Sequence, residues 1–366
     1  IAFLWALGTI IASVIWHFPQ YGLAGAAVWD LADIAGVPRE SKAAEYIVKF
    51  AAGILILGLN IFTTWNYGSR AKGIKLYEGF IRWVIRIVII SFAAVVIATI
   101  PRIDFGALFR GFCVPRIPEG EGTVTLMLGA FGAAVGINMT FLYPYSLLAK
   151  GWGKNHKGLS RWDLFSSMFL PFVLVTSLVI IAMANTVYNP DLGTVRTDLK
   201  PVDAAKALAA IEFLGGSWGR IIFDLGFMGM ACGAISTHMV VCGFTFCEMF
   251  GLEYTPKRYR LFTLVPAIGI LGVAFPSPLW MPVAASAICL TMLPIAYIAF
   301  LIMNNKKSYI GDATGKGLTR AVLNIVLIIA MAAATIGSVV KIKKGVIDQI
   351  PKLFANSAPT TQIAED

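Results

Sequence analysis

The sequence predicts an all-α polytopic membrane protein, and two observations carry this prediction. Of the 366 residues, 58% are hydrophobic and only 14% are charged, and the mean hydropathy is +0.76. The apolar residues occur in long runs, which is typical of transmembrane helices. A net charge of +10 would suggest nucleic acid in a soluble protein, but here the basic residues lie in short loops. We therefore expect a lipid bilayer as partner and no nucleic acid.

Nine apolar segments are expected to cross the membrane as helices. They cover residues 1–28, 44–63, 80–100, 123–150, 163–186, 218–249, 260–275, 279–303 and 318–340. We expect one transmembrane domain over residues 1–345, followed by a polar C-terminal tail over residues 346–366. The pattern does not predict the oligomeric state.

Charge in the loops predicts the orientation of these segments. The loops after segments two, four, six and eight are basic, whereas acidic residues match or exceed basic ones in the intervening loops. Because basic loops stay on the cytoplasmic side, the first segment is expected to run outward. We expect an integral protein of a bacterial inner membrane. The chain starts inside an apolar run without an initiator Met, which is typical of a fragment.

Several classes of enzyme lack support in the sequence. The five cysteines show no Cys-x-x-Cys spacing, and four of them lie in apolar segments, where a hydrophobic role is the default. The chain has three histidines and no nucleotide-binding motif, which argues against a zinc enzyme and an ATP-driven pump. We expect no enzymatic activity and no cofactor.

Segment four is interrupted where an ordinary helix would continue. Gly129, Gly132 and Gly136 are followed by Asn138 and Pro144. Helix interiors tolerate glycine poorly and proline worse. Non-helical backbone at membrane depth occurs only where it faces protein or a wet cavity, and secondary transporters build binding sites from such broken helices. We therefore expect a break at residues 136–139.

The residues at this break are suited to a hard cation. Carbonyl groups released between Ala133 and Gly136, together with the amide oxygen of Asn138, match the ligands that Mg²⁺, Ca²⁺ or Mn²⁺ prefer. The alternative is that the small residues only allow close helix packing, with Asn138 bonded to a neighbour. Tyr143, further along the segment, is a candidate for the ion pathway or for an interfacial aromatic belt.

Other polar residues inside apolar segments are weaker candidates for the pathway. His17 in the first segment can exchange protons near neutral pH, or be a hydrogen-bonded structural residue. Asp224 in the sixth segment is either functional or solvated near the surface, and it is too far from His238 for a direct pair. Glu78 precedes Arg82 by four residues in the third segment, which predicts an ion pair within that helix, with a cytoplasmic gate latch as alternative.

Three stretches resemble the NRAMP family of divalent-metal transporters. DFGALFRGFCVPRIPEGEGTVTLMLGAFGAAVGINM resembles the loop before the family's sixth helix and the first half of that helix. SRWDLFSSMFLPFVLVTSLVIIAMANTVY resembles the seventh helix, and Val265–Asp312 resembles helices nine and ten. The resemblance implies a LeuT-like inverted-repeat fold and matches the first segment to the family's third helix. The first two helices, with the Asp-Pro-Gly-Asn break that supplies the main carboxylate, are then expected to be missing.

Departures from the family's pattern suggest a subtype. The soft methionine ligand of the family's sixth helix matches Gly136, and two histidines there match Asn138 and Tyr143. Two acidic residues tied to proton movement match Trp16 and Pro19. Loss of sulfur favours hard ions, and loss of titratable groups removes a proton route. These changes resemble the NRAMP-related magnesium transporters.

We therefore expect transport of Mg²⁺, with Mn²⁺ as a further cargo, and no proton coupling. The first alternative is a proton-coupled Mn²⁺/Fe²⁺ transporter in which His17 or Asp224 replaces the lost relay. An amino-acid transporter of the same architecture is a second alternative, and a subunit that does not transport is a third.

Overall fold

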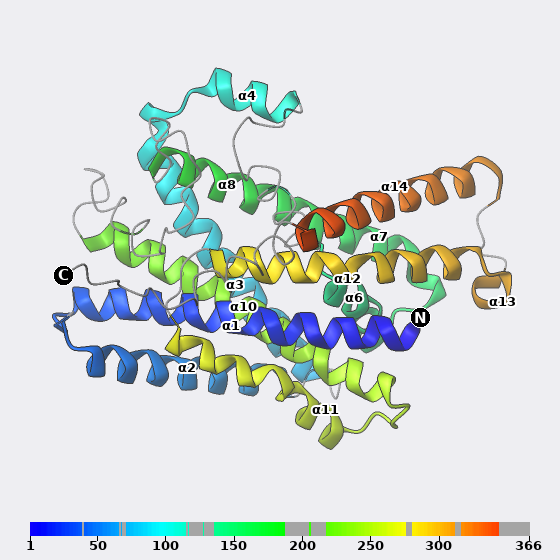
Figure 1. Cartoon of the computed structure of the whole chain (residues 1–366), viewed down its shortest axis with the longest axis horizontal. Helices are drawn as coiled ribbons and strands as arrows, with labels where there is room; N and C mark the ends of the chain where they lie inside the picture. The colour runs from blue at the N-terminus through cyan, green and yellow to red at the C-terminus, as the bar shows by residue number, and fades with distance from the viewer. Residues whose placement is uncertain are drawn as a thin grey trace, which may run out of the picture.

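The described part of this computed structural model is built from helices. It comprises residues 1–38, 40–65, 67, 71–114, 116, 127, 135–186, 205, 217–275, 280–311 and 316–343. Every regular element within these ranges is helical (Figure 1). The polar tail expected at residues 346–366 lies outside them.

The long helices and the short turns alternate along the chain. They are α1 (Ala2–Ile34), α2 (Lys42–Thr64), α3 (Ala71–Thr99), η1 (Ile100–Arg102), α4 (Phe105–Cys113), α6 (Ile137–Ala149), η2 (Lys154–His156), α7 (Lys157–Asp163), the π-helical η3 (Leu164–Phe169), α8 (Leu170–Thr186), α10 (Ser217–Met249), α11 (Pro256–Thr263), the 3-10 helix η6 (Val265–Ala274), α12 (Trp280–Asn305), α13 (Lys307–Ile310) and α14 (Gly317–Ile342). Helix α1 contacts α2, α6, α10, α12 and η6, and α10 contacts α1, α2, α3, α6, α11 and η6, so these two helices form the centre of the bundle.

Seven helical stretches in the described ranges are long and apolar enough to cross a membrane. They are Ala2–Ile34, Lys42–Thr64, Lys72–Arg102, Lys154–Thr186, Ser217–Met249, Ala285–Asn305 and Gly317–Val340. The prediction of an all-α polytopic membrane protein is confirmed. For the predicted segment 123–150, the described helix is the shorter α6, which begins at Ile137.

The predicted segment 260–275 is not one α-helix. It consists of α11 followed by the 3-10 helix η6. A 3-10 helix has three residues per turn, so Pro266, Gly269 and Gly272 lie on one face, and all three are buried. A Cβ on Gly269 would lie 2.2 Å from the Cβ of His17, and one on Gly272 would lie 2.1 Å from a backbone oxygen. The glycines therefore let η6 pack directly on the backbone of α1.

An ion-pair cluster joins the end of α1 to the start of α10. The guanidinium of Arg220 donates to Asp30 at 2.9 and 2.6 Å and to Asp33 at 2.6 Å. Asp30 is fully buried, so its charge requires this partner. The cluster keeps both aspartates inside the helix, which is why α1 extends beyond the predicted end at residue 28.

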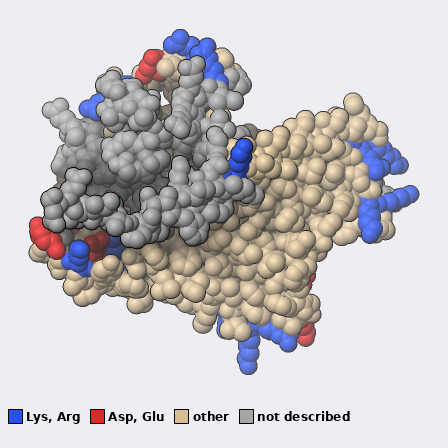
Figure 2. Space-filling view, in the orientation of Figure 1, with Lys and Arg blue, Asp and Glu red and all other residues tan. Residues whose placement is uncertain are grey.

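Charge is unevenly distributed over the visible face. In Figure 2, lysine and arginine side chains gather at α11 and α13 and also at α4, and the uncovered surface between these places carries few charges. Such an uncharged band between charged ends is the distribution that a lipid bilayer requires. The basic loops after segments six and eight lie at the end that holds α11 and α13, in agreement with the predicted topology.

The contact between η6 and α1 generates a stability prediction. We expect Gly272→Ala to lower the free energy of unfolding by about 1–3 kcal/mol, because the new Cβ meets the carbonyl of Phe18, a backbone atom that cannot rotate away. Thermal unfolding in detergent measures this effect. Gly58→Ala is the matched control, because a Cβ at Gly58 in α2 meets nothing within 4 Å. Equal melting temperatures for the two variants would contradict the packing argument.

Candidate cation site

The structure places the start of α6 where the sequence predicts the break. Gly136 is extended, with φ −84° and ψ 141°, and the helix begins at Ile137. The carbonyl of Gly136 accepts hydrogen bonds from the backbone N–H groups of Met139 at 3.1 Å and Thr140 at 3.2 Å. The first turn of a helix leaves N–H groups without intrahelical partners, so the atoms here that could ligate a cation are the carbonyl and side-chain oxygens. Ala133, the third predicted ligand, lies outside the described residues.

Asn138 is buried and folded back on the helix start. Its amide nitrogen donates to Ser13 Oγ at 3.4 Å, and its Oδ1 accepts from the backbone N–H of Met139 at 3.0 Å. A Cβ on Gly136 would lie 2.3 Å from this same Oδ1, so the amide oxygen takes the space that a side chain at position 136 would need. The bond to a neighbour that was the alternative for Asn138 therefore exists. An amide oxygen has two lone pairs, and one remains for a further partner.

A polar stripe on α1 lies against this helix start. Its members follow one another at four-residue spacing and are all buried: Trp5, Thr9, Ser13, His17 and Tyr21. Each of the hydroxyls of Thr9 and Ser13 donates to the carbonyl one turn earlier, at 2.8 Å, and the indole of Trp5 donates to the Ile137 carbonyl at 3.4 Å. Each step of four residues turns by about 40°, so the stripe winds around α1: Trp5 and Ser13 contact α6, and His17 lies beside α10. The stripe was visible in the sequence as this spacing, although only His17 was singled out.

Two histidines meet between α1 and α10. The rings of His17 and His238 lie 5.3 Å apart between centroids, and both side chains are buried. His17 Nδ1 lies 2.9 Å from the Ser13 carbonyl. A carbonyl only accepts, so Nδ1 carries the proton of this bond and Nε2 is the free ring nitrogen. The sequence places these residues far apart, so it did not predict their contact.

The other predicted pathway residues are dispersed over α1 and α10. Trp16 is half-buried and packs against the apolar cluster that contains Cys289, whereas Pro19 is buried within α1. Proline has no N–H, so the carbonyl of Ile15 has no helical donor. Asp224 is fully buried in α10, which argues against a solvated surface acid. Of these side chains, Trp16 packs against the cluster that also contains Ile137 at the start of α6.

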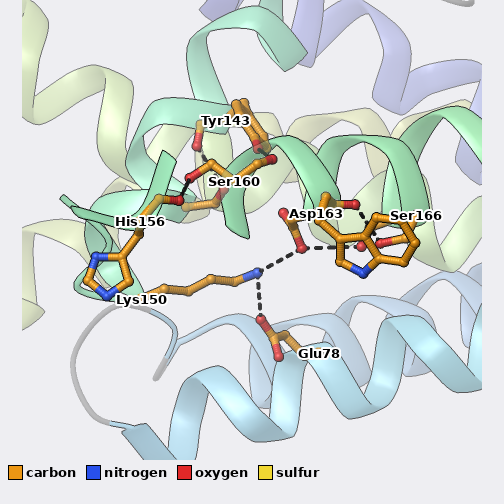
Figure 3. Close-up of polar contacts among 10 residues, drawn as sticks. Glu78, Tyr143, Lys150, His156, Ser160, Asp163 and Ser166 are labelled. Carbon is orange, nitrogen blue, oxygen red and sulfur yellow. Dashed lines mark hydrogen bonds and ion pairs between the residues drawn. The ribbon is translucent and has the colours of Figure 1, made fainter. Parts of the chain in front are cut away.

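The opposite end of α6 is held by an ionic network (Figure 3). Lys150 Nζ lies 3.2 Å from Glu78 Oε1 on α3 and 3.7 Å from Asp163 Oδ1 on α7. The hydroxyl of Tyr143 donates to the Ser160 carbonyl at 3.0 Å. The network therefore ties α6 to two other helices at one end of the bundle.

The prediction of an ion pair between Glu78 and Arg82 within α3 is wrong. Glu78 pairs with Lys150, and Arg82 instead donates to the backbone carbonyl of Glu78 at 3.2 Å. The guanidinium of Arg86 lies over the ring of Trp83 at 5.2 Å. An ion pair across helices replaces the local one because Lys150 approaches the carboxylate from α6.

The donors at the start of α6 are oxygen and nitrogen atoms of backbone, amide and hydroxyl groups. Among the described residues, no group of three or more His, Cys, Asp or Glu side chains could hold a metal ion. Four of the five cysteines are buried in the apolar interior, as predicted, and only Cys113 is exposed. Neutral oxygen donors favour hard cations over soft ones.

Seven helical stretches long and apolar enough to span a membrane, packed around a helix that begins inside the bundle, are the architecture of an integral membrane protein of the transporter type. The sequence model of one family, described as "Natural resistance-associated macrophage protein-like" (Nramp), matches residues 2–341. No curated protein sequence matches the chain. The chain belongs to the Nramp family, with the family's LeuT-like polytopic fold, and it transports divalent metal ions across the bilayer.

The network at Lys150 generates a prediction about coupling. Lys150→Gln and Glu78→Gln should each lower the free energy of unfolding by about 0.5–1 kcal/mol, because the partners are partly exposed to solvent. The double variant should lose less free energy of unfolding than the two single variants lose together, since both substitutions remove the same contact. Chemical or thermal unfolding of all four proteins gives the coupling. The exposed Lys154, changed to Gln, is the control, and strictly additive effects would contradict the pairing.

Proposed function

We propose that this transporter takes up Mg²⁺, with Mn²⁺ as a further cargo, across a bacterial inner membrane without proton symport. Gly136, Asn138 and the carbonyl of Ala133 would surround the ion, and Tyr143 would line the inner path. The observation that carries the proposal is the contact between Gly136 and Asn138. A glycine stands where the family's pattern has methionine, and an amide oxygen occupies the space of the missing side chain.

This exchange of atoms supports a preference for hard ions. A thioether favours soft transition metals, whereas an amide oxygen suits Mg²⁺. Mg²⁺ also gives up its water reluctantly, so it takes few protein ligands and suits a site that offers only a few oxygen atoms. Asn138 is only 2% exposed, so its oxygen would meet the ion out of bulk solvent.

The composition of α1 supports transport without protons. Trp16 and Pro19, at the positions of the family's acidic residues, have no carboxylate. The carboxylates of α1 are those of Asp30 and Asp33, which are paired with Arg220 near the end of the helix. The membrane potential supplies about 2.3 kcal/mol per charge per 100 mV, so a divalent ion gains roughly twice that amount. This energy is sufficient for uptake without a coupling ion.

One observation favours the proton-coupled alternative. His17 and His238 form a buried pair, and His17 Nε2 has no hydrogen-bond partner among the described residues. A histidine pair can accept and pass a proton. A proton-coupled Mn²⁺/Fe²⁺ transporter would use this pair, or Asp224, in place of the acids matched by Trp16 and Pro19.

Uptake into proteoliposomes distinguishes these two functions. With an inside-negative potential, we expect saturable Mg²⁺ entry and no change of internal pH, because α1 lacks the acidic relay. Metal flux and internal pH are recorded in the same vesicles with separate dyes. Mn²⁺ entry with acidification and without Mg²⁺ flux would contradict the proposal and favour the histidine pair. Empty vesicles with an ionophore give the baseline.

Restoring sulfur at the helix start should reverse the preference. We expect Gly136→Met to raise the ratio of Mn²⁺ to Mg²⁺ uptake by about tenfold or more, because a thioether favours the softer ion and the new side chain displaces the oxygen of Asn138. Competition between the two ions in proteoliposomes measures this ratio. Gly136→Leu is the control, since it has similar bulk and no sulfur. If both variants change the ratio equally, bulk alone sets the selectivity and the proposal fails.

A further inference from the structure

Helix α4 begins where a membrane span ends. The candidate span Lys72–Arg102 finishes three residues before Phe105, the first residue of α4. A chain extends at most about 3.5 Å per residue, so the start of α4 lies within roughly 10 Å of the end of the span. Chain connectivity therefore holds α4 at the membrane surface.

One side of α4 is an apolar stripe that no described part of the chain buries. Phe105, Leu108, Phe109 and Phe112 follow the i, i+3, i+4, i+7 spacing of a single helix face, and their exposed fractions are 60%, 38%, 70% and 76%. No residue of α4 is buried. Figure 1 shows α4 at the edge of the molecule, apart from the bundle. An exposed cluster of three phenylalanines requires an apolar partner.

Basic residues flank this stripe. Arg102, Arg110 and Arg116 are exposed, and Arg110 lies on the face of α4 opposite to the stripe. Within residues 102–116 the acidic residue is Asp104, whose carboxylate caps the helix by accepting from the backbone N–H of Ala107 at 2.9 Å. Glu119 and Glu121 follow in the sequence, outside the described residues. The segment thus combines an aromatic face with a positive charge, which matches the interface of an anionic bilayer.

We propose that α4 is an interfacial anchor, which inserts its phenylalanine stripe between the lipids around the end of α3 and places its arginines against anionic phospholipid headgroups. Each arginine near an anionic surface raises the local partitioning of the helix about fivefold. The anchor fixes the outer end of α3, the helix that carries Glu78 at its other end. This role of α4 in holding α3 does not depend on which ion is transported.

Cys113 offers a selective probe for this anchor. It is the last residue of α4 and is exposed, whereas Cys232, Cys242, Cys247 and Cys289 are buried. An environment-sensitive fluorophore attached to Cys113 in the full-length protein reports the polarity around α4. The protein is reconstituted into nanodiscs of phosphatidylcholine, with or without phosphatidylglycerol, and nitroxide-labelled lipids serve as quenchers.

We expect blue-shifted emission that lipid nitroxides quench, more strongly with phosphatidylglycerol and less at high salt. Phe109→Asp should shift the emission to that of a probe in water, because it charges the centre of the stripe. Ala107→Asp, on the opposite face, should retain quenching at least twofold greater than that of Phe109→Asp. Arg110→Gln should reduce the difference between the two lipid compositions.

Three results would overturn the anchor. The first is probe emission typical of water in both lipids. The second is equal quenching in the Phe109→Asp and Ala107→Asp variants. The third is burial of the probe that appears only when a nanodisc holds two copies, which would assign the stripe to an interface between copies. None of these measurements involves transport, so their outcome is independent of which ion the protein transports.

Discussion

Polar groups buried inside the bilayer must find partners within the protein, and this constraint organises the whole bundle. In α1 the buried hydroxyl and ring groups of the polar stripe find such partners within the helix. Thr9, Ser13 and His17 each bond to the carbonyl one turn earlier. The stripe leaves Ser13 Oγ as the acceptor for the amide of Asn138. The start of α6 is therefore positioned by α1, and η6 packs on the same helix through glycines.

The two ends of α6 are held by contacts of different strength. At the buried end, the amide nitrogen of Asn138 donates to Ser13, whereas its amide oxygen, the atom proposed to meet the cation, accepts from the backbone N–H of Met139. At the other end, Lys150 bridges Glu78 and Asp163 in partly solvated surroundings. Such pairs are worth about 1 kcal/mol or less, so they can open at low cost.

Local patterns determined much of this protein from the sequence. Hydropathy predicted the membrane-spanning class, because the bilayer imposes the same length and apolarity on each helix. The glycines and Asn138 predicted the break, and α6 begins at Ile137, inside the predicted range. The apolar segments around four of the five cysteines predicted that these four are buried. Each of these properties depends on residues close together in the chain and on their solvent.

Contacts between distant residues were decided only by the tertiary structure. His17 meets His238, and Glu78 pairs with Lys150 in place of Arg82, because packing brings separate helices together. The segment that ends at residue 275 reads as one apolar run, yet it forms a 3-10 helix whose glycines fit the backbone of α1. Hydropathy records that a residue is apolar and says nothing of which surface it meets. The partners of a side chain depend on the relative placement of helices, which no local pattern contains.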